Sequence, residues 1–425
     1  MKRNDTISIK SIKKYKSISI VNFILLFLLL LFCTVSIVPF FDLSIVRGIQ
    51  VVTIIAFFAY FLFHIKDSKL LTKIGIGLIC FYILILSYWG IGYSTAGIGN
   101  YFFQISFFIP IIAIVFCLTQ LSRKYNLIVY YFVVVMIGYR IINDIVIGQR
   151  YVGYSLRELQ EMGSSADSTP FITAVLFMFC VGFLIFLNCK NQFLKLIHLG
   201  IIILTVYYII FVGQRGSVVI LLFVSFLLIL YGKKVVSSGN GFYTFFYLLF
   251  LFLIMFLGDD IISFLIRLSP SERLTDRFSS LQYTYQHGIT DDSFSGRLML
   301  EMVSLRSWTS NVFSFFFGIG DHRLEGDFGM QGYVISGIGG HSEIIDSLAR
   351  YGLCGFTILA YLYYNICKLI LSLFKQAVVR SQVKAILIVG LLVGLTKGLF
   401  FPEIGLALFL LLPLSENFLN KQNNI

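Results

Sequence analysis

Long apolar stretches separated by short polar breaks dominate the 425-residue sequence. A helix needs about 20 apolar residues to cross the hydrocarbon core of a bilayer, so each stretch of that length predicts a membrane-spanning helix. About twelve are expected, at 19–39, 46–64, 74–92, 101–120, 125–145, 170–188, 195–213, 216–232, 241–258, 352–373, 384–401 and 404–420. The last is short and contains Pro413, which weakens its helical pattern. The pattern predicts an all-α polytopic membrane protein.

The composition supports this prediction, because 58% of the residues are apolar and 13% are charged, with a mean hydropathy of +0.89. Soluble domains have about 45–50% apolar and about 25% charged residues. The stretch 19–39 is longer than the apolar core of a signal peptide and no small-residue cleavage site follows it, so we expect it to stay as a helix. The seven cysteines lie within or beside the expected helices, and no Cys or His spacing resembles a metal site.

The basic residues indicate the orientation, since Lys and Arg in short loops are retained on the cytoplasmic side. This places both termini inside. In that topology 17 of the 20 inner basic residues are Lys, whereas 12 of the 13 outer ones are Arg, the exception being Lys397. Guanidinium groups grip phosphate or carboxylate at two points, so the outer arginines indicate an anionic ligand; alternatively, they pair with the outer acids. The net charge of +12 is spread over membrane-flanking loops, so no nucleic-acid partner is implied.

The chain is expected to be a single membrane domain with a small outer loop at 146–169 and a large one at 259–351. Loops as long as the second usually carry function. Within it, "SPSERLTDRFSSL" begins with a capping box and predicts a helix. Arg273 and Arg277 lie four residues apart on this helix, so an anion between them would relieve their repulsion, unless Asp276 already neutralises Arg273.

The large loop also contains "LMLEMVSLRSW", whose apolar stripe predicts a helix along the membrane interface with Trp308 at headgroup depth. The glycine-rich stretch "FFFGIGDHRLEGDFGMQGYVISGIGG" follows, either as a mobile flap over a site or as a simple connection.

Three short motifs carry candidate chemistry. In "VGQRGSVV", Arg215 is flanked by glycines at a tight outer turn, which favours ligand binding over a topological role. In "FSGR", Arg297 opens an expected helix, where its charge and the free backbone amides would together attract an anion. In "GIGGHSEIIDSLARYGLCGF", His341 lies near the outer lip, where it could hold or deprotonate a sugar hydroxyl, or serve as a helix cap or core residue. Asp346 and Arg350 in this stretch have the spacing of a helical ion pair.

Together these motifs resemble the O-antigen polymerase and O-antigen ligase superfamily. The shared features are "GQRGS" at a tight outer turn, a late large loop, "SGR" before a Trp-containing helix, "GIG", and "GHSEIIDSLARYGLCGF", which is similar to a family histidine motif followed by a leader such as "LLARYGIIGF". The similarity in motif order covers roughly 205 to 375. The family usually has Asn after the histidine, where this chain has Ser342.

The resemblance implies a GT-C-like, inverting and metal-independent glycosyltransferase without a cofactor. It would join oligosaccharide repeat units carried on undecaprenyl pyrophosphate at the outer face of the bacterial cytoplasmic membrane, for O-antigen or capsule synthesis. Arg215 and Arg297 would bind the pyrophosphate, with Arg273 and Arg277 as additions from the loop, and His341 would be catalytic. Further partners would be membrane lipids, a chain-length regulator and a flippase.

Two alternatives stay open. A ligase would share the fold and would transfer finished polymer to another acceptor. A transporter of a lipid-linked or anionic solute would show similar halves and polar residues near the bilayer midplane. His198 and the pair Arg140 and Asp144 are the ionisable residues nearest to that pattern.

Overall fold

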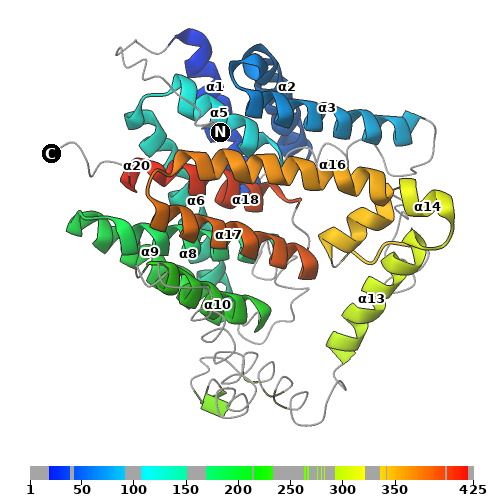
Figure 1. Cartoon of the computed structure of the whole chain (residues 1–425). Helices are drawn as coiled ribbons and strands as arrows, with labels where there is room; N and C mark the ends of the chain where they lie inside the picture. The colour runs from blue at the N-terminus through cyan, green and yellow to red at the C-terminus, as the bar shows by residue number, and fades with distance from the viewer. Residues whose placement is uncertain are drawn as a thin grey trace.

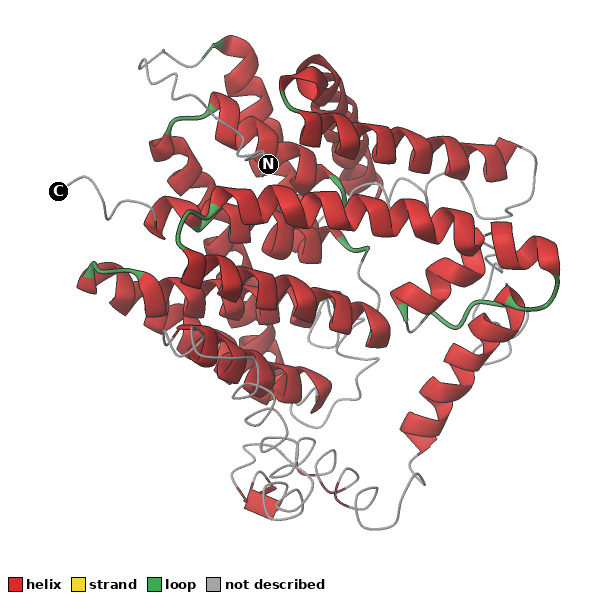
Figure 2. Cartoon of the chain, in the orientation of Figure 1, coloured by secondary structure: helices red, strands yellow, loops and turns green. Residues whose placement is uncertain are grey.

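The computed structural model describes residues 19–38, 43–90, 107–150, 169–212, 215–232, 292–320, 336–340, 342–397 and 400–419, with a few isolated positions between 263 and 282. Every regular element in this part of the chain is a helix (Figure 2). Nine of these described helices or helical segments are long and apolar enough to cross a membrane. The protein is therefore a helical, multi-pass membrane protein.

The helices are labelled as in Figure 1. Their bounds are α1 (Ile20–Ile37), α2 (Leu43–His64), α3 (Lys69–Gly90), α5 (Ile109–Gln120), α6 (Arg123–Arg150), α8 (Thr169–Asn188), α9 (Gln192–Val212), α10 (Arg215–Gly232), α13 (Asp292–Trp308), α14 (Val312–Phe317), α16 (Glu343–Leu373), α17 (Ala377–Thr396), α18 (Pro402–Gly405), η3 (Leu406–Leu411), α19 (Leu412–Leu414) and α20 (Glu416–Leu419).

The expected spans can be compared with these helices one by one. Nine of the twelve coincide with long apolar helices, and those at 101–120 and 216–232 coincide with the shorter apolar helices Ile109–Gln120 and Ser217–Gly232. The span at 241–258 lies outside the described residues, so the total of about twelve remains a prediction.

Two helical segments form the centre of the bundle. The segment Pro402–Leu419, which runs from α18 to α20, is 83% buried, and Pro170–Asn188 in α8 is 78% buried. The outer helices instead expose large apolar side chains, such as Phe23 of α1, Phe193 of α9 and Leu222 of α10. A soluble protein rarely exposes so many of these, whereas lipid tails solvate them without cost.

Pro413 explains the irregular geometry of the last segment. Its ring lacks an N–H group and clashes with the carbonyl four residues earlier, so a regular α-helical ladder cannot pass through it. The chain widens instead into the π-helical turn η3, followed by the short helices α19 and α20. The segment keeps its apolar character, and nearly all of its residues are buried.

Helix α16 is longer than the expected span 352–373 because it contains a kink. Gly352 has a φ of 61°, a left-handed conformation that L side chains rarely adopt. The residues after Gly352 match the expected span, while Glu343–Tyr351 forms an additional helical arm before it. The kink therefore separates the membrane-spanning part of α16 from a polar arm that carries ionisable residues.

Close backbone contacts hold α14 against this kink. A side chain at Gly318, which ends α14 with a φ of 77°, would overlap the backbone of Arg350, and a side chain at Gly352 would overlap that of Phe316. The hydroxyl of Tyr88, near the end of α3, donates to the carbonyl of Phe317. In Figure 1, α3, α16 and α17 run alongside one another, and α13 and α14 lie across the ends where α3 finishes and α16 begins.

Candidate functional site

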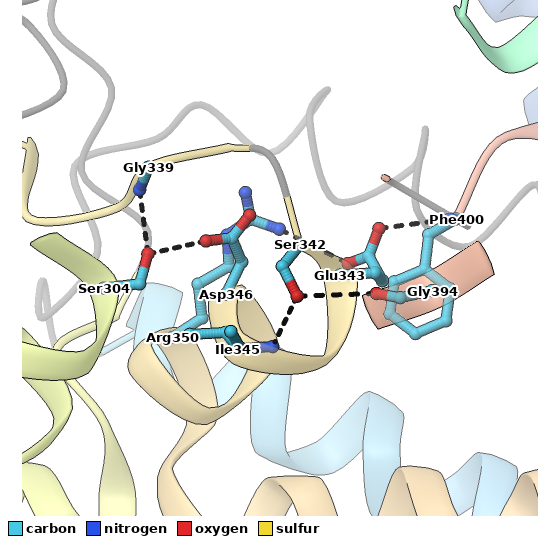
Figure 3. Close-up of polar contacts among 9 residues, drawn as sticks. All are labelled: Ser304, Gly339, Ser342, Glu343, Ile345, Asp346, Arg350, Gly394 and Phe400. Carbon is cyan, nitrogen blue, oxygen red and sulfur yellow. Dashed lines mark hydrogen bonds and ion pairs between the residues drawn. The ribbon is translucent and has the colours of Figure 1, made fainter. Parts of the chain in front are cut away.

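A buried hydrogen-bond network joins α13 to the first arm of α16. The hydroxyl of Ser304 donates to Oδ1 of Asp346 over 2.6 Å and accepts a bond of 2.8 Å from the backbone N–H of Gly339 (Figure 3). Ser304 is fully buried and Asp346 is 4% exposed. A Cβ on Gly339 would overlap the carbonyl of Leu300. The glycine-rich approach to α16 is therefore packed directly against α13 at residues 336–340.

Glu343, in the first turn of α16, connects this helix to the end of α17. Its backbone N–H donates to the carbonyl of Lys397 over 3.2 Å, and its Oε2 accepts the N–H of Phe400 over 3.2 Å. Its Oε1 lies 3.7 Å from Nη1 of Arg350. The carboxylate thus satisfies the backbone of the turn after α17 and pairs with a cation of its own helix.

Lys397 connects the same turn to α10. Helix α17 ends at Thr396, and Lys397 is its extended C-cap, whose N–H donates to Val393. Lys397 is only 8% exposed, and its Nζ donates a hydrogen bond of 2.9 Å to the hydroxyl of the fully buried Ser217. Ser217 lies in the first turn of α10, two residues after Arg215.

The first turns of α10 and α16 therefore meet at the turn after α17, and α13 joins them through Ser304, near its own C-terminal end. Arg215 is the first residue of α10. The sequence predicts that Arg297 opens its helix, but α13 already begins at Asp292, so position 297 is the sixth residue and lies beyond the free amides of the first turn. Positions seven residues apart fall on the same helix face, so position 297 shares the face of α13 on which Ser304 contacts Asp346. The side chains of Arg215 and Arg297 are not among those that the structure describes. His341, Arg273 and Arg277 lie outside the described residues.

Ser342 is the N-cap of α16. Its hydroxyl accepts the N–H of Ile345 over 3.3 Å and lies 3.5 Å from the carbonyl of Gly394 (Figure 3). The capping role considered for the neighbouring His341 is thus filled by Ser342. Serine is a favoured N-cap residue, so this role agrees with its residue type.

One sequence-based expectation changes at this site. The spacing predicts an ion pair of Arg350 with Asp346, but the close ion pair of Arg350 is with Glu343, two helical turns earlier. Asp346 bonds Ser304 and interacts with Arg350 electrostatically at longer range. The Nε1 of Trp308 donates to the carbonyl of Phe315 over 3.0 Å and its ring stacks on that of Phe315, so the indole joins α13 to α14. Its expected position at headgroup depth stays a prediction.

Sequence reasoning also missed the contacts of Ser217, Ser304 and Lys397. The two serines are isolated polar positions in apolar helices, and their partners are 180 and 42 residues away in the chain. One sequence signal pointed to Lys397: it is the single lysine among the basic residues expected on the outer side, which are otherwise arginines.

A second polar cluster surrounds Arg140 of α6. Its Nη1 donates to the carbonyl of Ile37 over 2.8 Å and lies 3.8 Å from Oε1 of Glu403, and its guanidinium stacks 3.9 Å above the ring of Phe171. Ile37 is the last residue of α1 and Glu403 lies in the first turn of α18. Arg140 therefore contacts the end of one helix and the start of another, rather than the middle of either.

Two further buried ionisable residues, Asp144 and His198, have structural partners. Asp144 accepts the hydroxyl of Tyr208 over 2.8 Å. The ring of His198 lies 3.2 Å from the hydroxyl of Tyr130 and bonds the carbonyl of Leu194, so it ties neighbouring helices together. Within the part of the chain that the structure describes, no three His, Cys, Asp or Glu side chains cluster as metal ligands would.

Comparison with known proteins does not identify a family for this chain. No protein-family model matches the sequence. No curated protein matches it significantly.

Proposed function

We propose that the protein is a polysaccharide polymerase that joins undecaprenyl-pyrophosphate-linked oligosaccharide repeat units at the outer face of the bacterial cytoplasmic membrane. The observation that carries the proposal is a set of buried contacts that joins the first turns of α10 and α16 to each other and to the last turns of α13. Ser304 ties α13 to Asp346, and Lys397 links Ser217 of α10 to the start of α16. These are the elements that bear Arg297 and Arg215 and that directly follow His341.

The proposed reaction suits this set of residue types. The hydroxyl oxygen of the acceptor sugar attacks the anomeric carbon of the donor, and the bond from that carbon to the pyrophosphate oxygen breaks with inversion. The pyrophosphate leaves with the bonding electrons, so Arg215 and Arg297 stabilise charge that develops as the bond breaks. His341 holds the acceptor hydroxyl or takes its proton. None of these steps requires the protein to supply a metal.

The surrounding network gives these groups a rigid support. Donors aimed at developing charge are effective only when they are held in place before the reaction. Buried contacts at Ser304, Glu343 and Lys397 supply such support from α13, α16 and α17. The kink at Gly352 keeps the arm that follows His341 distinct from the membrane-spanning part of the helix.

The test is polymerisation by the purified protein in nanodiscs, using the lipid-linked repeat unit made by its own biosynthetic locus, in the presence of EDTA. The proposal predicts a ladder of products that differ by one repeat unit. Transfer of preformed polymer to a different acceptor, without a ladder, would identify a ligase. Protein-dependent movement of the lipid-linked sugar across a liposome bilayer, again without a ladder, would identify a transporter and overturn the proposal.

A further inference from the structure

Lys397, in the turn after α17, forms hydrogen bonds to both α10 and α16. Its side chain bonds Ser217 of α10 and its main-chain carbonyl accepts the N–H of Glu343 of α16. One residue thus relates the first turn of α10 to the first turn of α16.

The chemistry of this contact is costly for a purely structural tie. Burying an ammonium group carries a large desolvation penalty, and the start of a helix bears a partial positive charge that disfavours a nearby cation. Residues whose burial or charge disfavours the folded state locally are most often found at functional sites.

The position of Lys397 next to the candidate site can explain why a buried ammonium group is present here. Ser217 lies two residues after Arg215 in α10, and Glu343 lies two residues after His341. A displacement of about 1 Å in a reacting group can lower a rate by about 100-fold, so the relative register of these two helix starts matters for the proposed chemistry.

We propose that Lys397 is a positioning residue that fixes the start of α10, and with it Arg215, relative to the start of α16, and with it His341. This inference rests on the proposed function for its effect on catalysis. Its structural part, the register of α10 against α16, is independent of the reaction.

The structural part is tested by a distance measurement on the full-length protein. Spin labels are attached at Arg215→Cys and at the exposed native Cys354 of α16, with the six other cysteines replaced, and the distance is measured by pulsed EPR in nanodiscs. We expect Lys397→Met to shift or broaden the distance distribution, and Lys397→Arg, which keeps a donor of similar reach, to preserve it. The control is Lys190→Met, at an exposed position after α8. An unchanged distribution in Lys397→Met would overturn the proposal.

The catalytic part is tested in the polymerisation assay, in protein that keeps Arg215. Lys397→Met should lower the rate about 10- to 100-fold, whereas Lys397→Arg should stay within about threefold of the parent and Lys190→Met should not differ. A full rate in Lys397→Met despite altered distances would overturn the link to catalysis. If the parent protein makes no ladder, the polymerase proposal fails, and the EPR distances alone decide whether Lys397 positions α10.

Discussion

The hydroxyl of Ser304 lies 2.6 Å from Oδ1 of Asp346, although 42 positions separate the two residues in the chain. The same hydroxyl accepts the N–H of Gly339, so a single side chain satisfies both a buried carboxylate and the glycine-rich segment before α16. A buried polar group left without its partner costs about 1–3 kcal/mol, which makes this serine a measurable support of the site.

Ser304→Ala should therefore lower the free energy of unfolding by about 1–3 kcal/mol, because it leaves both Asp346 and the N–H of Gly339 without this partner. Thermal unfolding of the purified protein in detergent measures the effect. Ser381→Ala is the matched control, since Ser381 is partly exposed on α17, its hydroxyl bonds the carbonyl of Ala377 in its own helix, and its loss should change stability by less than about 0.5 kcal/mol. Equal effects of the two substitutions would show that the Ser304 contact does not stabilise the fold.

Gly352→Ala tests the kink in α16. The substitution forces a Cβ into a left-handed conformation and against the backbone of Phe316, so we expect a loss of at least about 2 kcal/mol. Gly48→Ala provides the contrast, because no atom lies near its added Cβ and alanine favours the helix by up to about 1 kcal/mol. A stable Gly352→Ala protein would mean that α14 and α16 do not approach as closely as described.

The pair of Arg140 and Glu403 should behave as a coupled unit. Removing one partner of a buried ion pair leaves the other charge uncompensated and typically costs about 3–5 kcal/mol. Arg140→Met should therefore be strongly destabilising, and adding Glu403→Gln should recover part of the loss. Unfolding of the two single variants and the double variant gives the coupling energy. Strictly additive effects would contradict a direct interaction.

The orientation can be measured by cysteine labelling in intact cells, after replacement of the exposed Cys80 and Cys354. A membrane-impermeant maleimide should label Ser310→Cys, in the turn after α13, from outside. It should label Asn191→Cys, in the turn between α8 and α9, only after the membrane is permeabilised. Both positions are exposed. The reverse pattern would place the candidate site in the cytoplasm and exclude a reaction at the outer face.

The sequence alone predicts the membrane helices well, because a span depends on a local property. Runs of apolar residues such as 19–39 and 170–188 coincide with α1 and α8 within a few residues. The expected span 384–401 ends too late, since the helix stops at Thr396 and Lys397 continues as extended chain. Gly398 and Pro402, which follow it, are residues typical of helix ends and starts, but the apolar run hides them.

The candidate site is less predictable, because its contacts join distant parts of the chain. The partner of Ser304 could not be identified from α13 alone, and nothing near Ser217 indicates a buried lysine. Even within α16, the spacing favours Asp346 as the partner of Arg350, whereas tertiary contacts direct Asp346 to Ser304 and leave Glu343 for the ion pair. Local spacing can indicate which pairs are within reach, but the packing of other helices decides between them.

The most direct test of the proposed polymerase is the ladder assay in EDTA with four variants in matched pairs. Arg215→Ala and His341→Ala should each lower the rate of chain growth by about 100-fold or more, as loss of charge stabilisation and of a general base predicts. Arg306→Ala, at an exposed position of α13, and His64→Ala, at the C-terminal end of α2, should keep the parental rate. A ladder that persists unchanged in Arg215→Ala and His341→Ala would contradict the assignment of the site.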